Sequence, residues 1–229
     1  MDEMVNNTEQ NQIATTPAGS RNDEKEAEYN QRFRKNPQMW SDHARDAFAA
    51  RVVKEHWPEE PLGEEYPILR HIIDVGCGNG HTLEHFQHEF PHAKFYGGDI
   101  SGEALRIVAQ TLPDVCRIHG ELSEIKKLDW DFDVILAMGA LEHILDLPGA
   151  LRDIKALLKE DGICYMEIPN NLSYSTAGKG FHELTCGSRQ VEWHLTREQW
   201  EELIRNAGLV IVSRLVGERP EWEFVWVLK

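Results

Sequence analysis

The sequence is poor in cysteine, and its cysteines lack the spacing of a metal motif. Cys77, Cys116, Cys164 and Cys186 lie 22 to 48 residues apart in a chain of 229 residues, with no CxxC pair. This spacing is typical of neither a zinc site nor a disulfide framework, and thiols this sparse indicate a reducing compartment. We therefore expect a cytoplasmic protein.

Long apolar runs and a surplus of basic residues are also absent. No run approaches the roughly 20 residues that a membrane span needs, and the N-terminus lacks the basic and apolar regions of a secretory signal. The 24 Lys and Arg residues against 39 Asp and Glu residues give a formal charge of −15. Because a field of this sign repels phosphates and anionic lipids, nucleic acid and membrane surfaces are poor candidate partners.

Composition divides the chain into three parts. Residues 1–22 are polar and acidic, and we predict that they are disordered. Residues 23–65 predict a helical extension followed by a linker with proline, glycine and glutamate. Residues 66–229 carry the apolar periodicity of one α/β domain, for which this length is sufficient.

Strand and helix patterns alternate through residues 66–229. Runs that are apolar on both faces, separated by amphipathic stripes, predict a parallel sheet covered by helices on both sides. Two β-rich runs at 209–215 and 223–228 have no room for a helix between them and predict an antiparallel hairpin at the sheet edge. The expected fold is α/β, a doubly wound sheet of seven mostly parallel strands with the last strand antiparallel. The other predicted strands are Ile72–Val75, Lys94–Gly97, Val115–His119, Phe132–Met138 and Ile163–Ile168.

A glycine-rich turn joins the first strand of this domain to its first helix. The segment Asp74-Val-Gly-Cys-Gly-Asn-Gly80 has three alternating glycines directly after a buried strand. Glycine lets the backbone turn tightly and approach a ligand, and the following helix N-terminus favours an anion. The dinucleotide motif GxGxxG would need glycine at position 81, where the chain has His81. A tight turn without a ligand is the alternative interpretation.

An acid ends the next strand of the predicted sheet. Asp99 follows Gly80 by 19 residues, and a carboxylate at such a strand end can accept two hydrogen bonds from a ribose diol. Capping of the following helix is the competing role, but Ser101 is able to cap that helix by itself. We therefore predict that Asp99 binds a ribose.

The pattern D-x-G-x-G-x-G from Asp74 to Gly80 resembles the first motif of the class I S-adenosylmethionine-dependent methyltransferases. The resemblance extends over residues 66–229 and includes the segment 132–144, which matches the family's fourth strand and the loop after it. It implies a Rossmann-like fold and S-adenosylmethionine as cofactor, with S-adenosylhomocysteine as product. Together with the reasoning above it predicts the following cofactor-binding residues: Asp74, Gly76, Cys77, Gly78, Gly80, Asp99, Ile100, Gly120, Glu121, Leu122, Met138 and Gly139.

Histidines supply the candidate catalytic groups. His143 follows the fourth strand on the ligand side of the sheet, and an imidazole suits proton removal from an acceptor; bracing of the loop is the alternative role. His182 and His194 are weaker candidates. Ubiquinone-pathway O-methyltransferases resemble this stretch, and some hold a divalent metal with an additional glutamate. Gly139 occupies that glutamate's place here, so no metal is predicted.

The segment 170–194 is predicted to be a substrate lid or binding loop. Long loops inside compact domains are typically of this kind, with disorder as the alternative. Tyr174, Phe181 and Trp193 are the aromatic side chains predicted to contact the acceptor. The helices of residues 23–65 are expected either to form a second wall of the site or only to pack against the domain.

The function predicted from these features is methyl transfer from S-adenosylmethionine to a small-molecule acceptor. A hydroxyl of a metabolite, sugar or natural-product intermediate is the favoured target, and the protein is expected to be a monomer or homodimer. A non-catalytic protein that binds S-adenosylmethionine is the first alternative, because the displacement needs little from side chains. A nicotinamide-dependent oxidoreductase is the second, and His81 argues against it.

Overall fold

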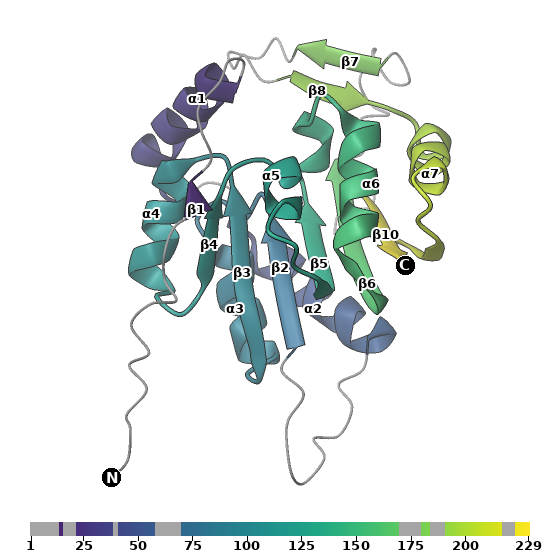
Figure 1. Ribbon diagram of the computed structural model, residues 1–229, viewed down its shortest axis with the longest axis horizontal. Helices are drawn as coiled ribbons and strands as arrows, with labels where there is room; N and C mark the ends of the chain where they lie inside the picture. Colours follow the sequence, from purple (N-terminus) through teal and green to yellow (C-terminus); the bar gives the residue numbers. More distant parts are fainter. Residues whose placement is uncertain are drawn as a thin grey trace, which may run out of the picture.

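The computed structural model describes residues 14–15, 22–38, 41–57, 70–169, 180–183, 191–216 and 223–229. This part of the chain holds an eight-stranded sheet in the order β1-β4-β3-β2-β5-β6-β10-β9 and a separate β7–β8 pair (Figure 1). The strands are β1 (Ala14–Thr15), β2 (Arg70–Val75), β3 (Ala93–Asp99), β4 (Cys116–His119), β5 (Phe132–Met138), β6 (Leu158–Pro169), β7 (Gly180–Glu183), β8 (Val191–His194), β9 (Ile211–Val216) and β10 (Glu223–Leu228). The helices are α1 (Asn22–Lys35), α2 (His43–His56), α3 (His81–Glu89), α4 (Gly102–Thr111), α5 (Leu122–Lys126), the 3-10 helix η1 (Leu141–His143), α6 (Leu147–Leu157) and α7 (Arg197–Asn206).

Helices cover both faces of the sheet. On one face, α5, α6 and α7 pack against a layer that includes Ile73 and Ile135. On the other face, α2, α3 and α4 pack against a layer that includes Ile72 and Val134. Successive side chains of a strand point to opposite faces, so a strand buried on both sides must be apolar throughout. The predicted Rossmann-like, doubly wound fold is confirmed, and the two-residue β1 adds one strand to the seven that were expected.

The C-terminal hairpin has an order that the sequence analysis did not resolve. β10 pairs antiparallel with both β6 and β9, so the last strand lies inside the sheet and β9 forms its edge. The burial patterns explain this order. Phe224 to Leu228 are all buried in β10, whereas burial alternates residue by residue in β9, which leaves Val212 and Val216 exposed. A continuous apolar strand requires neighbours on both sides.

The N-terminal helices pack against the domain at two places. Phe33 of α1 is buried with Ala104 and Ile107 of α4, and α2 contributes to the layer over α3. Asp42 caps α2 by accepting a hydrogen bond from the Arg45 amide. The division of the chain into segments 1–22, 23–65 and 66–229 stays a prediction. Within the segment 1–22, Ala14–Thr15 form β1, which pairs with β4.

The segment 170–194 contains regular structure where a loop was expected. Gly180–Glu183 and Val191–His194 pair antiparallel as β7 and β8, and this hairpin lies at the same end of the sheet as α1 (Figure 1). Residues 170–179 and 184–190, with Tyr174, lie outside the described residues. β8 contacts η1, so the hairpin is placed beside the loop that follows β5.

Candidate functional site

The glycine loop after β2 adopts a backbone that favours glycine. Gly76, Gly78 and Gly80 have φ angles of 77°, 53° and 83°, which side chains with a Cβ rarely adopt. A Cβ on Gly76 would lie 2.6 Å from the Cβ of Ala140. The amides of Gly76 and Cys77 both donate to the Gly98 carbonyl, at 2.8 and 3.0 Å. The loop is therefore tied to β3 and packed against the residue after Gly139.

Gly80 has a different role from the one that the sequence predicted. It is the N-cap of α3, and a Cβ there would lie 3.0 Å from side-chain atoms of both Leu112 and Val108. Its missing side chain lets α3 approach α4. Gly80 does not line the cavity described below.

Asp99 fixes the glycine loop through its carboxylate. Its two oxygens accept hydrogen bonds from the amides of Gly78, at 2.9 Å, and Ser101, at 2.7 Å. Ser101 caps α4 with its own hydroxyl, as the sequence analysis expected. Burial raises the pKa of Asp99, and the two amide hydrogen bonds oppose that rise. A carboxylate has about four acceptor positions, so this group retains capacity for a ribose diol.

A cavity of about 580 Å³ opens at the carboxyl ends of the central strands. Its size lies within the usual range of small-molecule sites, roughly 300–1,000 Å³. The predicted cofactor residues other than Gly80 line it, and so does His143. The predicted residues in the lining are Asp74, Gly76, Cys77, Gly78, Asp99, Ile100, Gly120, Glu121, Leu122, Met138, Gly139 and His143.

This lining fits S-adenosylmethionine. The left-handed residues Gly76 and Gly78 bring the backbone of the glycine loop to the cavity wall. The carboxylates of Asp99 and Glu121 stand at the ends of adjacent strands. Carboxylates there suit ribose hydroxyls, and the net acidic lining suits a sulfonium cation.

The helix α1 forms a wall of the cavity. Lys25, Tyr29 and Phe33 follow one another by four residues, so they share one helix face, and all three line the cavity. Phe33 lies 3.2 Å from the position of a Cβ on Gly78. The Lys25 ammonium donates to the His143 carbonyl at 2.7 Å, and burial lowers the pKa of Lys25. The N-terminal extension therefore forms a wall of the site as well as packing against the domain.

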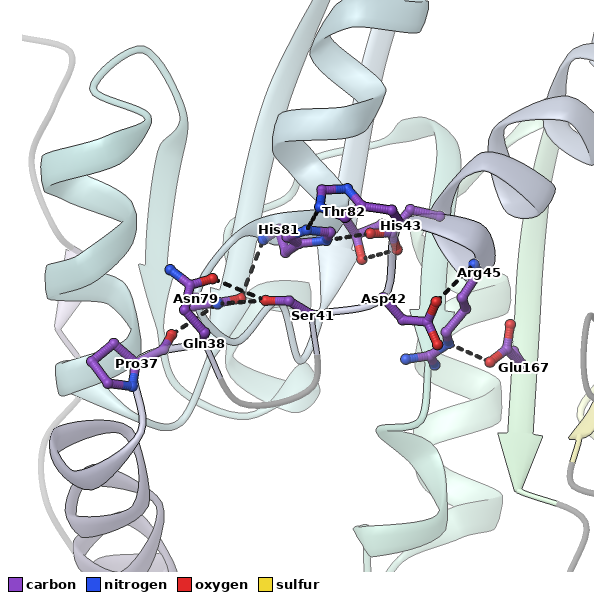
Figure 2. A network of polar contacts seen from close by, with 11 residues as sticks. Pro37, Gln38, Ser41, Asp42, His43, Arg45, Asn79, His81, Thr82 and Glu167 are labelled. Carbon is purple, nitrogen blue, oxygen red and sulfur yellow. Dashed lines mark hydrogen bonds and ion pairs between the residues drawn. The ribbon is translucent and has the colours of Figure 1, made fainter.

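The start of α2 is bound to the glycine loop by polar contacts (Figure 2). The Asn79 amide donates to the Pro37 carbonyl at 2.8 Å and to the Ser41 hydroxyl at 3.1 Å. His81, which stands where the dinucleotide motif needs glycine, contacts the buried Asp46 carboxylate through Nδ1 at 2.5 Å. Thr82 donates to the same carboxylate at 2.8 Å. The side chain of His81, at the position where the dinucleotide motif has glycine, therefore links α3 to α2.

Arg45 lies on the cavity wall and extends from α2 to β6 (Figure 2). Its guanidinium forms an ion pair with Glu167, and the Tyr165 hydroxyl donates to the same carboxylate at 3.1 Å. Arg45 was not among the predicted site residues. A basic residue one turn into a helix gives no signal of its own in the sequence.

Two glutamates flank His143 beyond the glycine loop. The Nε2 atom of His143 lies 3.7 Å from Glu142 and 3.9 Å from Glu192. Burial raises the pKa of Glu142 from 4.5 to about 8, with Glu192 adding to the effect, and burial raises the pKa of Glu192. The ring of Tyr29 lies edge-on to His143 at 6.5 Å. Glu142, which lies within the segment 132–144 but was given no role, and Glu192 join Lys25 and Arg45 as lining side chains that the sequence analysis missed.

Trp193 and His194, the remaining predicted residues whose side chains are described, do not line the cavity. Trp193 donates its indole N–H to the Ile144 carbonyl at 2.7 Å, which anchors β8 to the loop after η1. His194 is buried, 3.8 Å from Glu192. Phe181 and His182 belong to β7, where they pair with Trp193 and Glu192 in register.

The part of the chain that the structure describes has neither a cluster of metal-ligating side chains nor a membrane-spanning helix. In that part of the chain, no group of three or more His, Cys, Asp or Glu side chains is arranged to hold a metal ion. None of the helices described is long and apolar enough to cross a membrane.

Comparison with known proteins places the chain in a family. The family model described as a methyltransferase domain matches residues 41–214. The ubiquinone biosynthesis O-methyltransferase of Ruegeria pomeroyi is 31% identical over 68% of this chain and 66% of its own length. The trans-aconitate 2-methyltransferase of Deinococcus radiodurans is 27% identical, over 75% of this chain and 67% of its own length. A third relative, named arginine-hydroxylase NDUFAF5, mitochondrial, from Danio rerio, is 29% identical over 66% of this chain and 43% of its own length. Several matched relatives are thus aligned over less than two thirds of their length.

Solved structures show the same fold at low sequence identity. The 1,6-didemethyltoxoflavin-N1-methyltransferase of Burkholderia thailandensis, solved with S-adenosylhomocysteine, matches with a TM-score of 0.66 at 18% identity, over 94% of this chain and 92% of its own. The sugar N-methyltransferase KedS8 of Streptoalloteichus matches with a TM-score of 0.64 at 18% identity, over 94% of this chain and 96% of its own. The chain belongs to the methyltransferase domain family and has the class I fold of S-adenosylmethionine-dependent methyltransferases.

Proposed function

We propose that this protein transfers a methyl group from S-adenosylmethionine to a hydroxyl of a small-molecule acceptor. The observation that carries the proposal is one continuous cavity, which joins the glycine loop and Asp99 to the Glu142–His143 segment. The first set of residues fits the cofactor and the second offers groups for an acceptor. The net charge of −15 and a cavity of small-molecule size favour a small metabolite over nucleic acid.

The residues of the chain have separate tasks in this proposal. Asp99 and the amides around Gly78 bind and orient the nucleoside, and Lys25 with Tyr29 closes the cavity from α1. When bound, S-adenosylmethionine supplies an electrophilic methyl group, which bonds to the acceptor oxygen while the electron pair of its old bond stays on sulfur. His143 takes the hydroxyl proton on Nε2, and the flanking carboxyl groups of Glu142 and Glu192, in their ionised form, stabilise the resulting positive charge. Alignment in a dry site contributes on the order of 7–11 kcal/mol to such displacements.

Two measurements test the proposal in order. Titration calorimetry with S-adenosylhomocysteine should give a saturable heat with the folded protein, and nicotinamide dinucleotide should give none. Incubation with methyl-labelled S-adenosylmethionine and a panel of hydroxyl compounds should then transfer label to at least one of them. Because one relative is named a hydroxylase, transfer of the label itself is the required readout. Cofactor binding without transfer to any panel member would favour the non-catalytic alternative.

The proposed base has its own test. His143→Ala should lose most of the turnover, while its affinity for S-adenosylhomocysteine stays near that of the wild type, because the imidazole faces the acceptor part of the cavity. His92→Ala is the matched control, since His92 is an exposed histidine before β3. A His143→Ala variant with wild-type turnover from about pH 6 to about pH 9 would show that the imidazole only braces the loop.

Two further expectations belong to the same proposal. A cytoplasmic location is consistent with the described cysteines, because Cys77, Cys116 and Cys164 are all free thiols. The oligomeric state is expected to be monomeric or dimeric, and size-exclusion chromatography with light scattering would test it.

A further inference from the structure

The part of the cavity around η1 is acidic. Glu142 of η1, Glu192 of β8 and Glu167 of β6 all line it. Glu167 is neutralised by its ion pair with Arg45. Within the described part of the chain, the ion-pair contacts of Glu142 and Glu192 are to imidazoles only, at 3.7 to 3.9 Å. The region therefore has more carboxylates than cations.

Glu142 is a buried carboxyl with an unused oxygen. The residue is 1% exposed, and its Oε2 atom has no hydrogen-bond partner among the described residues. Burying such a group without a partner costs about 1–3 kcal/mol or more. Native proteins pair most buried polar atoms, so an exception on a cavity wall indicates a missing ligand.

Glu201 shows how the same fold treats a glutamate that serves structure alone. It is also buried, but it accepts hydrogen bonds from Arg205, Arg214 and Trp226. These bonds lower the pKa of Glu201 to about 2, whereas burial raises the pKa of Glu142 to about 8. The contrast sets Glu142 apart as a group that lacks its partner.

The cations that line the cavity are engaged elsewhere. Lys25 and Arg45 are the lysine and arginine side chains in the lining, as far as the chain is described. Lys25 donates to the His143 carbonyl, and Arg45 pairs with Glu167. Both cations also interact electrostatically with Glu142 itself, so neither is free to neutralise a carboxylate of an acceptor bound there.

We propose that Glu142, in its ionised form, selects the acceptor by charge: it binds a hydrogen-bond donor, a hydroxyl or an amine, on an uncharged or cationic molecule, and it excludes molecules with a carboxylate at that position. This inference rests on the proposed function, because it names the acceptor class of the same site. Glu192 adds to the exclusion by its charge, and His143 lies between the two carboxylates. The acceptor would supply the partner that Glu142 lacks.

The test uses three probes that share one ring: benzylamine, benzyl alcohol and benzoate. Each is titrated by ligand-observed NMR into the full-length protein saturated with S-adenosylhomocysteine, at about pH 9, where a carboxyl with a pKa of about 8 is ionised. We expect benzylamine and benzyl alcohol to bind at least tenfold more tightly than benzoate. In Glu142→Gln, which keeps the shape and removes the charge, benzylamine affinity should fall at least tenfold and the discrimination against benzoate should shrink. Glu160→Gln, an exposed glutamate of β6, is the matched control and should behave as the wild type.

The outcomes separate this inference from the proposed function. Benzoate binding as tight as benzylamine, no binding of either donor probe, or an unchanged profile in Glu142→Gln would overturn the charge selection while S-adenosylhomocysteine binding stands. Absence of S-adenosylhomocysteine binding to folded wild-type protein would instead overturn the proposed function and the inference with it. Thermal melting and S-adenosylhomocysteine affinity of each variant show that it is folded.

Discussion

Asp74 begins the glycine motif, and its burial makes the stability of the protein depend on pH. The residue is 3% exposed. Burial and the nearby Asp46 and Asp99 raise its pKa from 3.8 to about 8, while Arg45 opposes the rise. In the unfolded chain an aspartate has a pKa near 3.9. The folded state therefore holds the proton more tightly, and this contribution to stability is lost as pH rises from about 4 to about 8.

The magnitude follows from the size of the shift. At about 1.36 kcal/mol per pKa unit, a rise from 3.8 to about 8 corresponds to roughly 6 kcal/mol. Local relaxation and water entry reduce such penalties in real proteins, so we expect Asp74→Asn to raise the free energy of unfolding by about 2–4 kcal/mol at about pH 8. For a domain of this size, that is a rise in Tm of roughly 5–15 °C.

The assay is thermal unfolding without cofactor, followed by circular dichroism. The difference in Tm between Asp74→Asn and wild type should be small near pH 4.5 and should grow toward pH 8. Asp161→Asn, at an exposed aspartate of β6, is the control and should show no such growth. A difference that does not change with pH, or a variant less stable than wild type near pH 8, would refute the reasoning.

The same variant should bind the cofactor less well. Asp74 lines the cavity beside the glycine loop. Replacing its carboxyl group with an amide therefore changes a contact in the cofactor site, while it also removes the cost of burying a charged carboxylate. A gain in stability with a loss of function is typical of binding-site residues. Calorimetry with S-adenosylhomocysteine would detect the loss, and unchanged affinity would place Asp74 outside the contact surface.

Three other substitutions give distinct outcomes. Asp99→Ala should weaken S-adenosylhomocysteine binding by roughly 1.5–3 kcal/mol in calorimetry, from the loss of charge-assisted hydrogen bonds; wild-type affinity would remove Asp99 from the site. Gly78→Val should abolish that binding, because φ is 53° there and a Cβ already lies 3.2 Å from Phe33; a folded variant that still binds would contradict the loop assignment. Glu201→Gln should lower the free energy of unfolding by about 2 kcal/mol near pH 7. Since the pKa of Glu201 is lowered to about 2, this contribution is present above about pH 4.5 and is lost as pH falls toward 2. Urea unfolding would measure it, with the exposed Glu202→Gln as control; a deficit that persists near pH 2 would contradict the assignment.

Structural features that depend on residues close together in the sequence were predictable from it. The glycine loop, the strand that precedes it and Asp99 depend on local backbone conformation and on the alternation of strands and helices. The caps at Ser101 and Thr196 are likewise local, since each accepts from an amide three residues later. The interior position of β10 was not predicted, since the sequence indicated only a hairpin at the sheet edge and the pairing with β6 and β9 decides which of its strands lies inside.

The walls of the cavity were decided only by the tertiary structure. Lys25 contacts His143, which is 118 residues away in the sequence, and Arg45 contacts Glu167, which is 122 residues away. The charge state of Glu142 depends on burial by segments far from it in sequence, including Glu192 of β8. Local patterns fix which residues form a strand or a turn. The pKa values and ion pairs of the cavity depend on which distant residues the packing brings within a few ångströms. The spacing of residues in the sequence does not reveal those distances.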